Sequence, residues 1–230
     1  MKIEVLADAD AVANAAAAVI AADARAAVAA RGRYVFAVSG GTTPWVMLRA
    51  LAGEDVPWHA VHVLQVDERV APAGDPVRNL THLAESLFAR APLARQSVHA
   101  MPVEAPDLDA AAARYAQLLR ELAGTPPVLD LVHLGLGPDG HTASLVPGDP
   151  ALDVTVDDVT VTGVYQGHQR MTLTFPTLDR ARRILWLVTG AEKQPMLVRL
   201  RAGDRAIPAG RVRNEHALIL ADAAAVGGKS

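Results

Sequence analysis

The sequence of 230 residues contains no cysteine. This absence excludes a disulfide framework and any metal site with cysteine ligands. The two histidines that lie nearest to each other along the chain, His59 and His62, would point to opposite faces of a strand and so form no ligand pair. We therefore expect no metal ion, and the lack of cysteine agrees with a cytoplasmic protein.

Clusters of basic residues are absent as well. The formal net charge is −3 at pH 7, lysine and arginine form no block, and no basic helix-turn-helix or basic arm is visible. Binding to nucleic acid or to an anionic membrane surface requires such an electrostatic footprint. The sequence therefore predicts neither a nucleic-acid partner nor a membrane partner.

A long uncharged hydrophobic run is also missing, although alanine dominates residues 11–30. Asp23 and Arg25 interrupt this stretch, and Asp8 and Asp10 precede it. A secretory signal core carries no such charges, whereas alanine favours helices and aspartate favours the N-cap position. The stretch therefore predicts an amphipathic helix that packs on a sheet.

No linker divides the chain. Hydrophobic residues make up 51% of it and charged residues only 20%, which is sufficient for one large core. Apolar runs that end in glycine or polar residues predict buried strands, and helical segments lie between them. This pattern predicts one α/β domain over residues 1–230, with a doubly wound, mostly parallel sheet and helices on both faces. The expected strands are 34–38, 61–66, 129–136, 159–164, 171–175, 184–188 and 217–220, and further helices are expected at 79–90 and 108–122.

Residues 129–147, LDLVHLGLGPDGHTASLVP, carry the strongest functional signal. A buried strand runs into a glycine-rich turn that contains Asp139 and His141. Ligands of open α/β sheets bind at the carboxyl edge of the strands. The sequence therefore places the His141 imidazole where a ligand can reach it.

A second strand, glycine turn and helix occur in the segment YVFAVSGGTTPW. Backbone N–H groups of such a loop, the start of the helix and the nearby hydroxyl groups can together bind an anion. We interpret the loop as a phosphate cradle, and the alternative is a tight turn that binds nothing. Its residues are Ser39, Gly40, Gly41, Thr42 and Thr43. The loop matches neither the GxGxxG fingerprint nor the P-loop, so nothing indicates NAD or ATP and we expect no cofactor.

Charged residues follow two further strands. Asp67, Glu68 and Arg69 come directly after one of them. Because consecutive strand residues face opposite ways, one carboxylate plus the Arg69 guanidinium is favoured over a pair of carboxylates. Lys193 falls in the first turn of a helix, where a cation opposes the helix dipole unless it shares an anion with the N-terminus. The alternative for the DER segment is a surface ion pair, and the alternative for Lys193 is a solvated lysine that binds nothing.

The combination of SGGTTP, DER, LGLGPDGHTASLVPG and TGAEK, in this order over most of the chain, resembles the 6-phosphogluconolactonases of the pentose phosphate pathway. The histidine segment is the most specific of the four. The resemblance implies a Rossmann-like fold shared with the glucosamine-6-phosphate deaminases. It also implies hydrolysis of 6-phospho-D-glucono-1,5-lactone to 6-phospho-D-gluconate by a histidine general base, without a metal.

Carried across residue by residue, the resemblance gives His141 the role of the base. Asp67 and Asp139 match acidic positions of the family motifs and are candidate catalytic residues. The positions associated with the sugar phosphate are Ser39, Gly40, Gly41, Thr42, Arg69 and Lys193.

The sequence departs from the family pattern in two places. Arg78 and Asn79 stand where the pattern usually carries Ser-Asn. The segment VYQGHQRMTLTF replaces an expected Lys-Pro-rich loop. Within it, Arg170 is a candidate phosphate or lid contact, and His168 has no assigned role.

The residues themselves support this chemistry. Lactone hydrolysis needs a base that deprotonates the attacking water. A neutral histidine can act as this base and increase the reaction rate about 10²–10⁴-fold. Asp139 or Asp67 would hold the imidazole, while glycine turns or a nearby cation would bind the oxyanion. A serine nucleophile, Ser144 or Ser39, is disfavoured, because the chain has no G-x-S-x-G elbow and Ser144 is expected inside a helix that follows His141.

Two rival functions remain to be tested. An amino-sugar-phosphate deaminase or isomerase of the same fold carries a glutamate in HIAFNEP, whereas the matching HTASLVP has no acid, and the tyrosine of its DEY motif is Arg69 here. A non-catalytic sugar-phosphate sensor would need a DNA-reading segment or a partner. The sequence does not determine the oligomeric state, so a homodimer remains one of the options.

Overall fold

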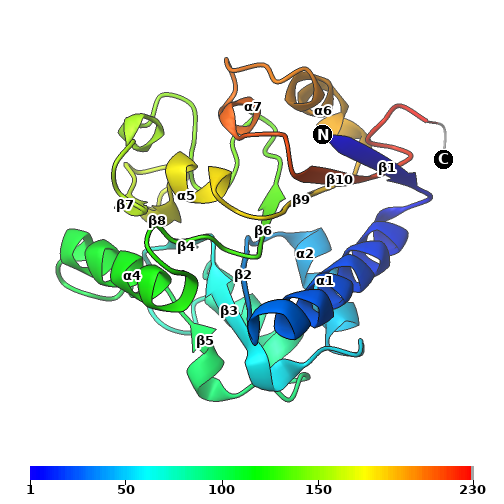
Figure 1. The fold of residues 1–230 in the computed structure, drawn as a ribbon. Helices are drawn as coiled ribbons and strands as arrows, with labels where there is room; N and C mark the ends of the chain where they lie inside the picture. Colours follow the sequence, from blue (N-terminus) through cyan, green and yellow to red (C-terminus); the bar gives the residue numbers. More distant parts are fainter. Residues whose placement is uncertain (229–230) are drawn as a thin grey trace.

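The central layer of the protein is a seven-stranded sheet (Figure 1), seen in a computed structural model that describes residues 1–228. All neighbouring strands of this sheet pair in parallel. Helices lie on both of its faces, so the predicted doubly wound α/β architecture is confirmed. From edge to edge the strands are β1 (Lys2–Leu6), β10 (Ala217–Asp222), β9 (Ile184–Val188), β6 (Leu131–Gly135), β2 (Tyr34–Val38), β3 (Val61–Gln65) and β5 (Val98–His99).

The two faces of the sheet are covered differently. On one face lie α1 (Ala9–Arg31), α2 (Thr42–Leu51), α3 (Asn79–Leu83) and a π-helical turn (Ala84–Phe88). The other face carries a small antiparallel sheet and four helices. The small sheet consists of β4 (Asp67–Arg69), β8 (Arg170–Leu173) and β7 (Val159–Val161), and the helices are α4 (Leu108–Ala123), α5 (Phe175–Asp179), α6 (Gln194–Arg201) and α7 (Pro208–Arg211).

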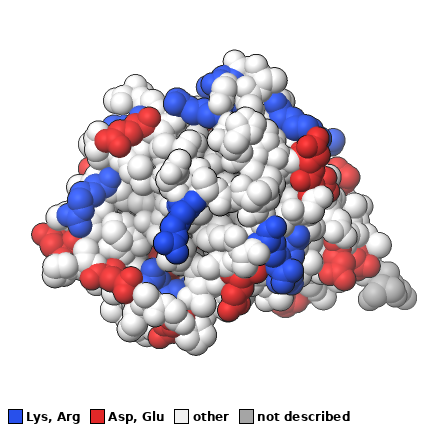
Figure 2. Space-filling model, turned by 90° about the horizontal axis from the view of Figure 1, so that it is seen from below, with Lys and Arg blue, Asp and Glu red and all other residues white. Residues whose placement is uncertain are grey.

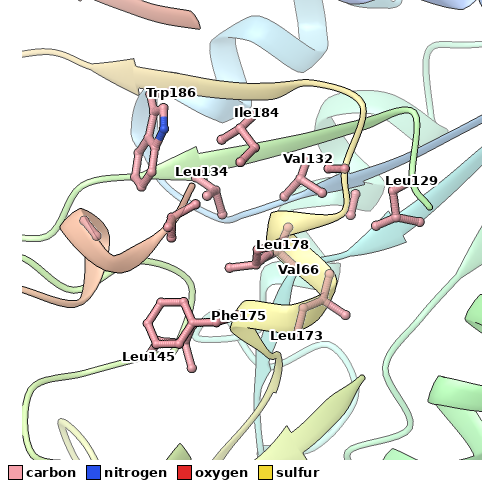
Figure 3. Close-up of a cluster of buried hydrophobic side chains, with 14 of the residues drawn as sticks. Val66, Leu129, Val132, Leu134, Leu145, Leu173, Phe175, Leu178, Ile184 and Trp186 are labelled. Atoms are coloured by element: carbon pink, nitrogen blue, oxygen red, sulfur yellow. The ribbon is translucent and has the colours of Figure 1, made fainter. Parts of the chain in front are cut away.

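Strand residues alternate between two hydrophobic clusters, one on each face of the sheet. In β2, Tyr34 and Phe36 belong to the cluster under α1 and α2, whereas Val35 and Ala37 belong to the opposite one. Figure 3 shows side chains of β6 and β9, among them Ile184 and Trp186, on the side of the sheet where α5 lies. Burial on both faces explains why the strands are continuous apolar runs rather than alternating ones.

Helix α1 forms from the alanine-rich stretch, as predicted. Asp8 caps its start by accepting a hydrogen bond from the Ala11 N–H, and Gly32 ends it in the left-handed conformation. By length and composition alone, the helix is long and apolar enough to cross a membrane, but 44% of its apolar 18-residue stretch is buried inside the protein. Its buried alanines pack closely against α2 and the sheet, and a helix of the protein core can have the same length and apolar composition.

Charged residues are spread over the surface that Figure 2 shows. On this face lysine and arginine side chains alternate with aspartate and glutamate side chains, separated by uncharged surface. Neither sign of charge forms a continuous patch on the face in view.

Two local predictions were wrong. Ser144 does not lie in a helix, because residues 142–145 form a tight turn in which Ala143 has a φ of 51°. Tertiary hydrogen bonds hold this turn, since the Ser144 N–H donates to Thr172 and its hydroxyl donates to Asp67. Phe175 does not end a strand but begins α5, where the following proline favours a helix start.

A buried histidine in β6 makes the stability of the fold sensitive to acid. Burial lowers the pKa of His133 to about 3 from an ordinary value of 6.5. As the pH falls below about 6.5, the unfolded chain takes up a proton that the folded protein refuses until about pH 3. Through His133, the free energy of unfolding therefore decreases by up to ~1.4 kcal/mol for each pH unit by which the pH falls below 6.5.

We expect the variant His133→Asn to lose part of this acid sensitivity. An asparagine oxygen can still accept the hydrogen bond that His133 Nδ1 receives from the Ser39 N–H, but it does not titrate. Urea unfolding at pH 7 and pH 4.5 measures the change in unfolding free energy for both proteins. An equal change in the two proteins would contradict the assignment.

Candidate active site

Four loops converge at the carboxyl edge of the sheet. Strands β9, β6, β2 and β3 are neighbours, so the segments that follow them lie side by side. They surround a cavity of about 370 Å³. The predicted site residues that line it are Ser39, Gly40, Gly41, Thr42, Asp67, Arg69, His141, Arg170 and Lys193. Asp139 is the only residue of the predicted set outside this lining, and it lies directly behind His141.

The turn after β6 presents the His141 imidazole to the cavity. The Gly137 N–H donates to the His141 carbonyl, and the Gly140 N–H donates to the Gly137 carbonyl, which closes the turn. The imidazole lies so close to Gly137 that a Cβ placed there would come 2.1 Å from Nδ1. Glycine is therefore required at this position for the ring to occupy its place.

Asp139 fixes the orientation of this ring. Its Oδ1 is 2.5 Å from His141 Nδ1 and also accepts the His141 backbone N–H at 3.1 Å. Partial burial raises the pKa of Asp139, but these hydrogen bonds and one from Tyr165 outweigh burial and hold it below its usual value. An ionised Asp139 favours the tautomer with the proton on Nδ1, so Nε2 is the nitrogen with a free lone pair.

Asp67 has a different position in the site. Its two oxygens accept hydrogen bonds from the Ser144 hydroxyl at 2.7 Å and from the Ser39 hydroxyl at 3.4 Å. It makes no hydrogen bond to the imidazole. Of the two carboxylates considered from the sequence, the geometry selects Asp139 as the partner of His141, and Asp67 ties the loop after β2 to the turn at Ser144.

Two arginines stand side by side in the cavity wall. Arg69 and Arg170 are directly opposite each other in the pairing of β4 with β8. Arg170 is only 3% exposed, and no acceptor within residues 1–228 reaches its Nε. Burial, followed by the like charge of Arg69, lowers the pKa of Arg170. Two adjacent guanidinium groups with an unsatisfied buried donor form a site for an anion.

The loop that holds Arg69 depends on residues that the sequence left unexplained. Arg78 is buried and pairs with the fully buried Glu68, whose carboxylate also accepts the Asn79 N–H. The Asn79 side chain accepts from Arg69 at 2.9 Å and donates to the Asp67 carbonyl at 3.0 Å. Arg78 and Asn79 therefore hold this loop in place. The sequence alone could not show this, because these contacts depend on the path that the loop takes.

The remaining predicted anion ligands come from the loops after β2 and β9. Helix α2 begins at Thr42 with no side-chain cap and no acidic residue in its first turn, so its N–H groups face the cavity without an internal anion. Lys193 immediately precedes α6 and has no ion pair within the part of the chain that the structure describes. Glu192, for which the sequence predicts no role, lines the cavity beside it.

The cavity contains an imidazole held by a carboxylate, is lined by cationic side chains and lies at the carboxyl edge of a parallel sheet. These features define a class of protein, the α/β enzymes that act on small anionic substrates. The chain matches the family model of glucosamine-6-phosphate isomerases/6-phosphogluconolactonase over residues 7–220. It therefore belongs to the glucosamine-6-phosphate isomerase/6-phosphogluconolactonase family.

Individual relatives agree with this membership. The chain is 39% identical to a 6-phosphogluconolactonase of Synechocystis over 175 residues, which cover 74% of the chain and 72% of the relative. It is 35% identical to a 6-phosphogluconolactonase of Nostoc, with 86% of each protein covered. Among solved structures, the 6-phosphogluconolactonase of Thermotoga maritima superimposes with a TM-score of 0.85 at 27% identity, covering 96% of this chain and 98% of that one.

We expect the variant Arg170→Met to weaken the binding of inorganic phosphate. Phosphate at 100 times its dissociation constant stabilises a folded protein by about 2.7 kcal/mol and raises its melting temperature. Without phosphate, the variant should be at least as stable as the wild type, because the repulsion from Arg69 and the unsatisfied donor are both removed. Thermal melts with and without phosphate measure both effects.

The control for this experiment is Arg49→Met, which removes an exposed arginine from α2. It should retain the full phosphate-induced rise in melting temperature. If Arg170→Met also retained that rise, the arginine pair would not be the anion site.

Proposed function

We propose that the protein hydrolyses 6-phospho-D-glucono-1,5-lactone to 6-phospho-D-gluconate in the cytoplasm, with His141 as the general base. The observation that carries the proposal is the Asp139–His141 pair at a cavity that is lined by Arg69, Arg170 and Lys193. Relatives with 35–39% identity that are named 6-phosphogluconolactonase support the same activity.

In this mechanism His141 activates water. Nε2 accepts a proton as the water oxygen forms a bond to the lactone carbonyl carbon, and Asp139 stabilises the resulting imidazolium. The bond from this carbon to the ring oxygen then breaks, and the ring oxygen takes the proton from the imidazolium. The carboxylic acid formed in this way loses its remaining proton to solvent, which gives the gluconate, and no covalent enzyme intermediate is needed.

The position of Ser144 favours water as the nucleophile over a serine. Ser144 is fully buried, and its hydroxyl donates to Asp67 rather than to an imidazole. A serine nucleophile needs a hydroxyl that is exposed to substrate and hydrogen-bonded to a base. The first condition is not met, because Ser144 is fully buried.

The phosphate group fixes the sugar against the base. Arg69 and Arg170 offer guanidinium donors, and the loop from Ser39 to Thr42 offers backbone N–H groups at the start of α2. These contacts are remote from the reacting carbon, so their binding energy serves to orient the ring. The carbonyl is thereby held near Nε2 of His141.

We expect His141→Ala to reduce kcat by 10²–10⁴-fold, the range typical of a lost general base, while folding is retained. Arg69→Ala and Lys193→Ala should mainly raise KM, because they remove contacts made equally in the ground state and the transition state. A pH-stat assay measures acid release, read as the excess over spontaneous lactone opening. The control is His59→Ala, which removes an exposed histidine that does not belong to the cavity lining.

A near-normal excess rate for His141→Ala would show that another group is the base. Ammonia release from glucosamine 6-phosphate, without lactone hydrolysis, would replace the lactonase assignment with a deaminase. Tight binding of a sugar phosphate without turnover of either substrate would indicate a sensor.

A further inference from the structure

The segment that departs from the family pattern forms a hairpin over the site. Tyr165 and His168 exchange two backbone hydrogen bonds, of 3.0 and 3.2 Å, across a two-residue turn. The turn residues Gln166 and Gly167 have φ angles of 51° and 82°, the left-handed pair that closes a tight hairpin. The hairpin precedes β8 directly, so Tyr165 is held in a fixed position relative to Arg170.

Tyr165 contacts three groups of the candidate site. Its hydroxyl donates to Oδ2 of Asp139 at 3.0 Å. Its ring meets the imidazole of His141 edge-on, with a centroid distance of 5.6 Å and an interplanar angle of 67°. The guanidinium carbon of Arg170 lies 5.1 Å from the centre of the same ring. One side chain therefore touches both members of the catalytic pair and a phosphate-binding arginine.

We propose that Tyr165 is a positioning residue, which locks the Asp139 carboxylate in the orientation that holds His141 and links this pair to Arg170. The inference rests on the proposed function and extends it. Asp139 is 35% exposed, so its carboxylate could rotate away from the ring in water. With Oδ1 bound to His141 and Oδ2 bound to Tyr165, both oxygens are fixed.

The hydroxyl of Tyr165 is suited to this task at neutral pH. Partial burial and the hydrogen bond to Asp139 raise the pKa of Tyr165 above its ordinary value of 10.0. The phenol therefore remains protonated and keeps donating throughout the range in which a histidine base works. Asp139, whose pKa is lowered, remains an ionised acceptor in the same range.

The test is Tyr165→Phe, which removes the hydroxyl and keeps the ring between His141 and Arg170. We expect kcat to fall about tenfold, the effect of one hydrogen bond to a charged group. KM should change less than twofold, because the ring contact with Arg170 remains. The acidic limb of the pH profile of kcat/KM should move to higher pH, because an Asp139 without its donor attracts the imidazolium more strongly.

A double-mutant cycle separates positioning from a structural effect. In an Asp139→Asn background, Tyr165→Phe should cost less than twofold in kcat, since the carboxylate that it orients is gone. The control Tyr34→Phe removes a buried hydroxyl that has no partner within residues 1–228, and should leave kcat and the pH profile unchanged. An unchanged kcat and profile for Tyr165→Phe, or the same tenfold loss in the Asp139→Asn background, would overturn the proposal.

A second readout does not depend on lactonase activity. The Nδ1 proton of His141, in its hydrogen bond to Asp139, should give a downfield proton NMR signal that exchanges slowly with water. The Tyr165→Phe variant should exchange this proton several-fold faster. An equal exchange rate in both proteins would contradict the role of Tyr165, whereas a wild type without lactonase activity would contradict the proposed function alone.

Discussion

The parallel pairing of β2 with β6 at the centre of the sheet is the constraint on which the candidate site depends. The chain continues outwards in opposite directions from these two strands, to β3 on one side and to β9 on the other. Such a reversal leaves a crevice at the carboxyl edge, because the flanking helices diverge there. The loop from Ser39 and the turn of His141 line the same cavity because these strands are neighbours.

Within this crevice the charges are divided between two tasks. The proposed anion site brings Arg69 and Arg170 together despite their mutual repulsion, which a bound phosphate would relieve. The proposed base, His141, has a different environment, in which the single carboxylate of Asp139 holds the imidazole. Tyr165 lies between the two parts, with its ring against Arg170 and its hydroxyl on Asp139.

Much of this arrangement could be predicted from the sequence, because it depends on local patterns. The four apolar runs that end in glycine or charged residues predicted the central strands and the edge at which their loops meet. Ser39, Arg69, His141 and Lys193 follow those strands directly, so their convergence followed from the topology.

The parts that could not be predicted depend on contacts between distant segments. Ser144 lies in a turn rather than a helix because its hydroxyl bonds to Asp67, 77 residues away in the chain. The pairing of Tyr165 with Asp139 spans 26 residues and depends on a hairpin. The edge strands β1 and β5 were not predicted, because no residue of β1 is fully buried and β5 has only two residues.

The most direct test of the account is a crystal structure with the product 6-phospho-D-gluconate bound. The account predicts that the new carboxylate lies within hydrogen-bond distance of Nε2 of His141, with the phosphate against Arg69 and Arg170. A product bound in the reverse direction, with its phosphate at His141, or bound outside this cavity would contradict the account.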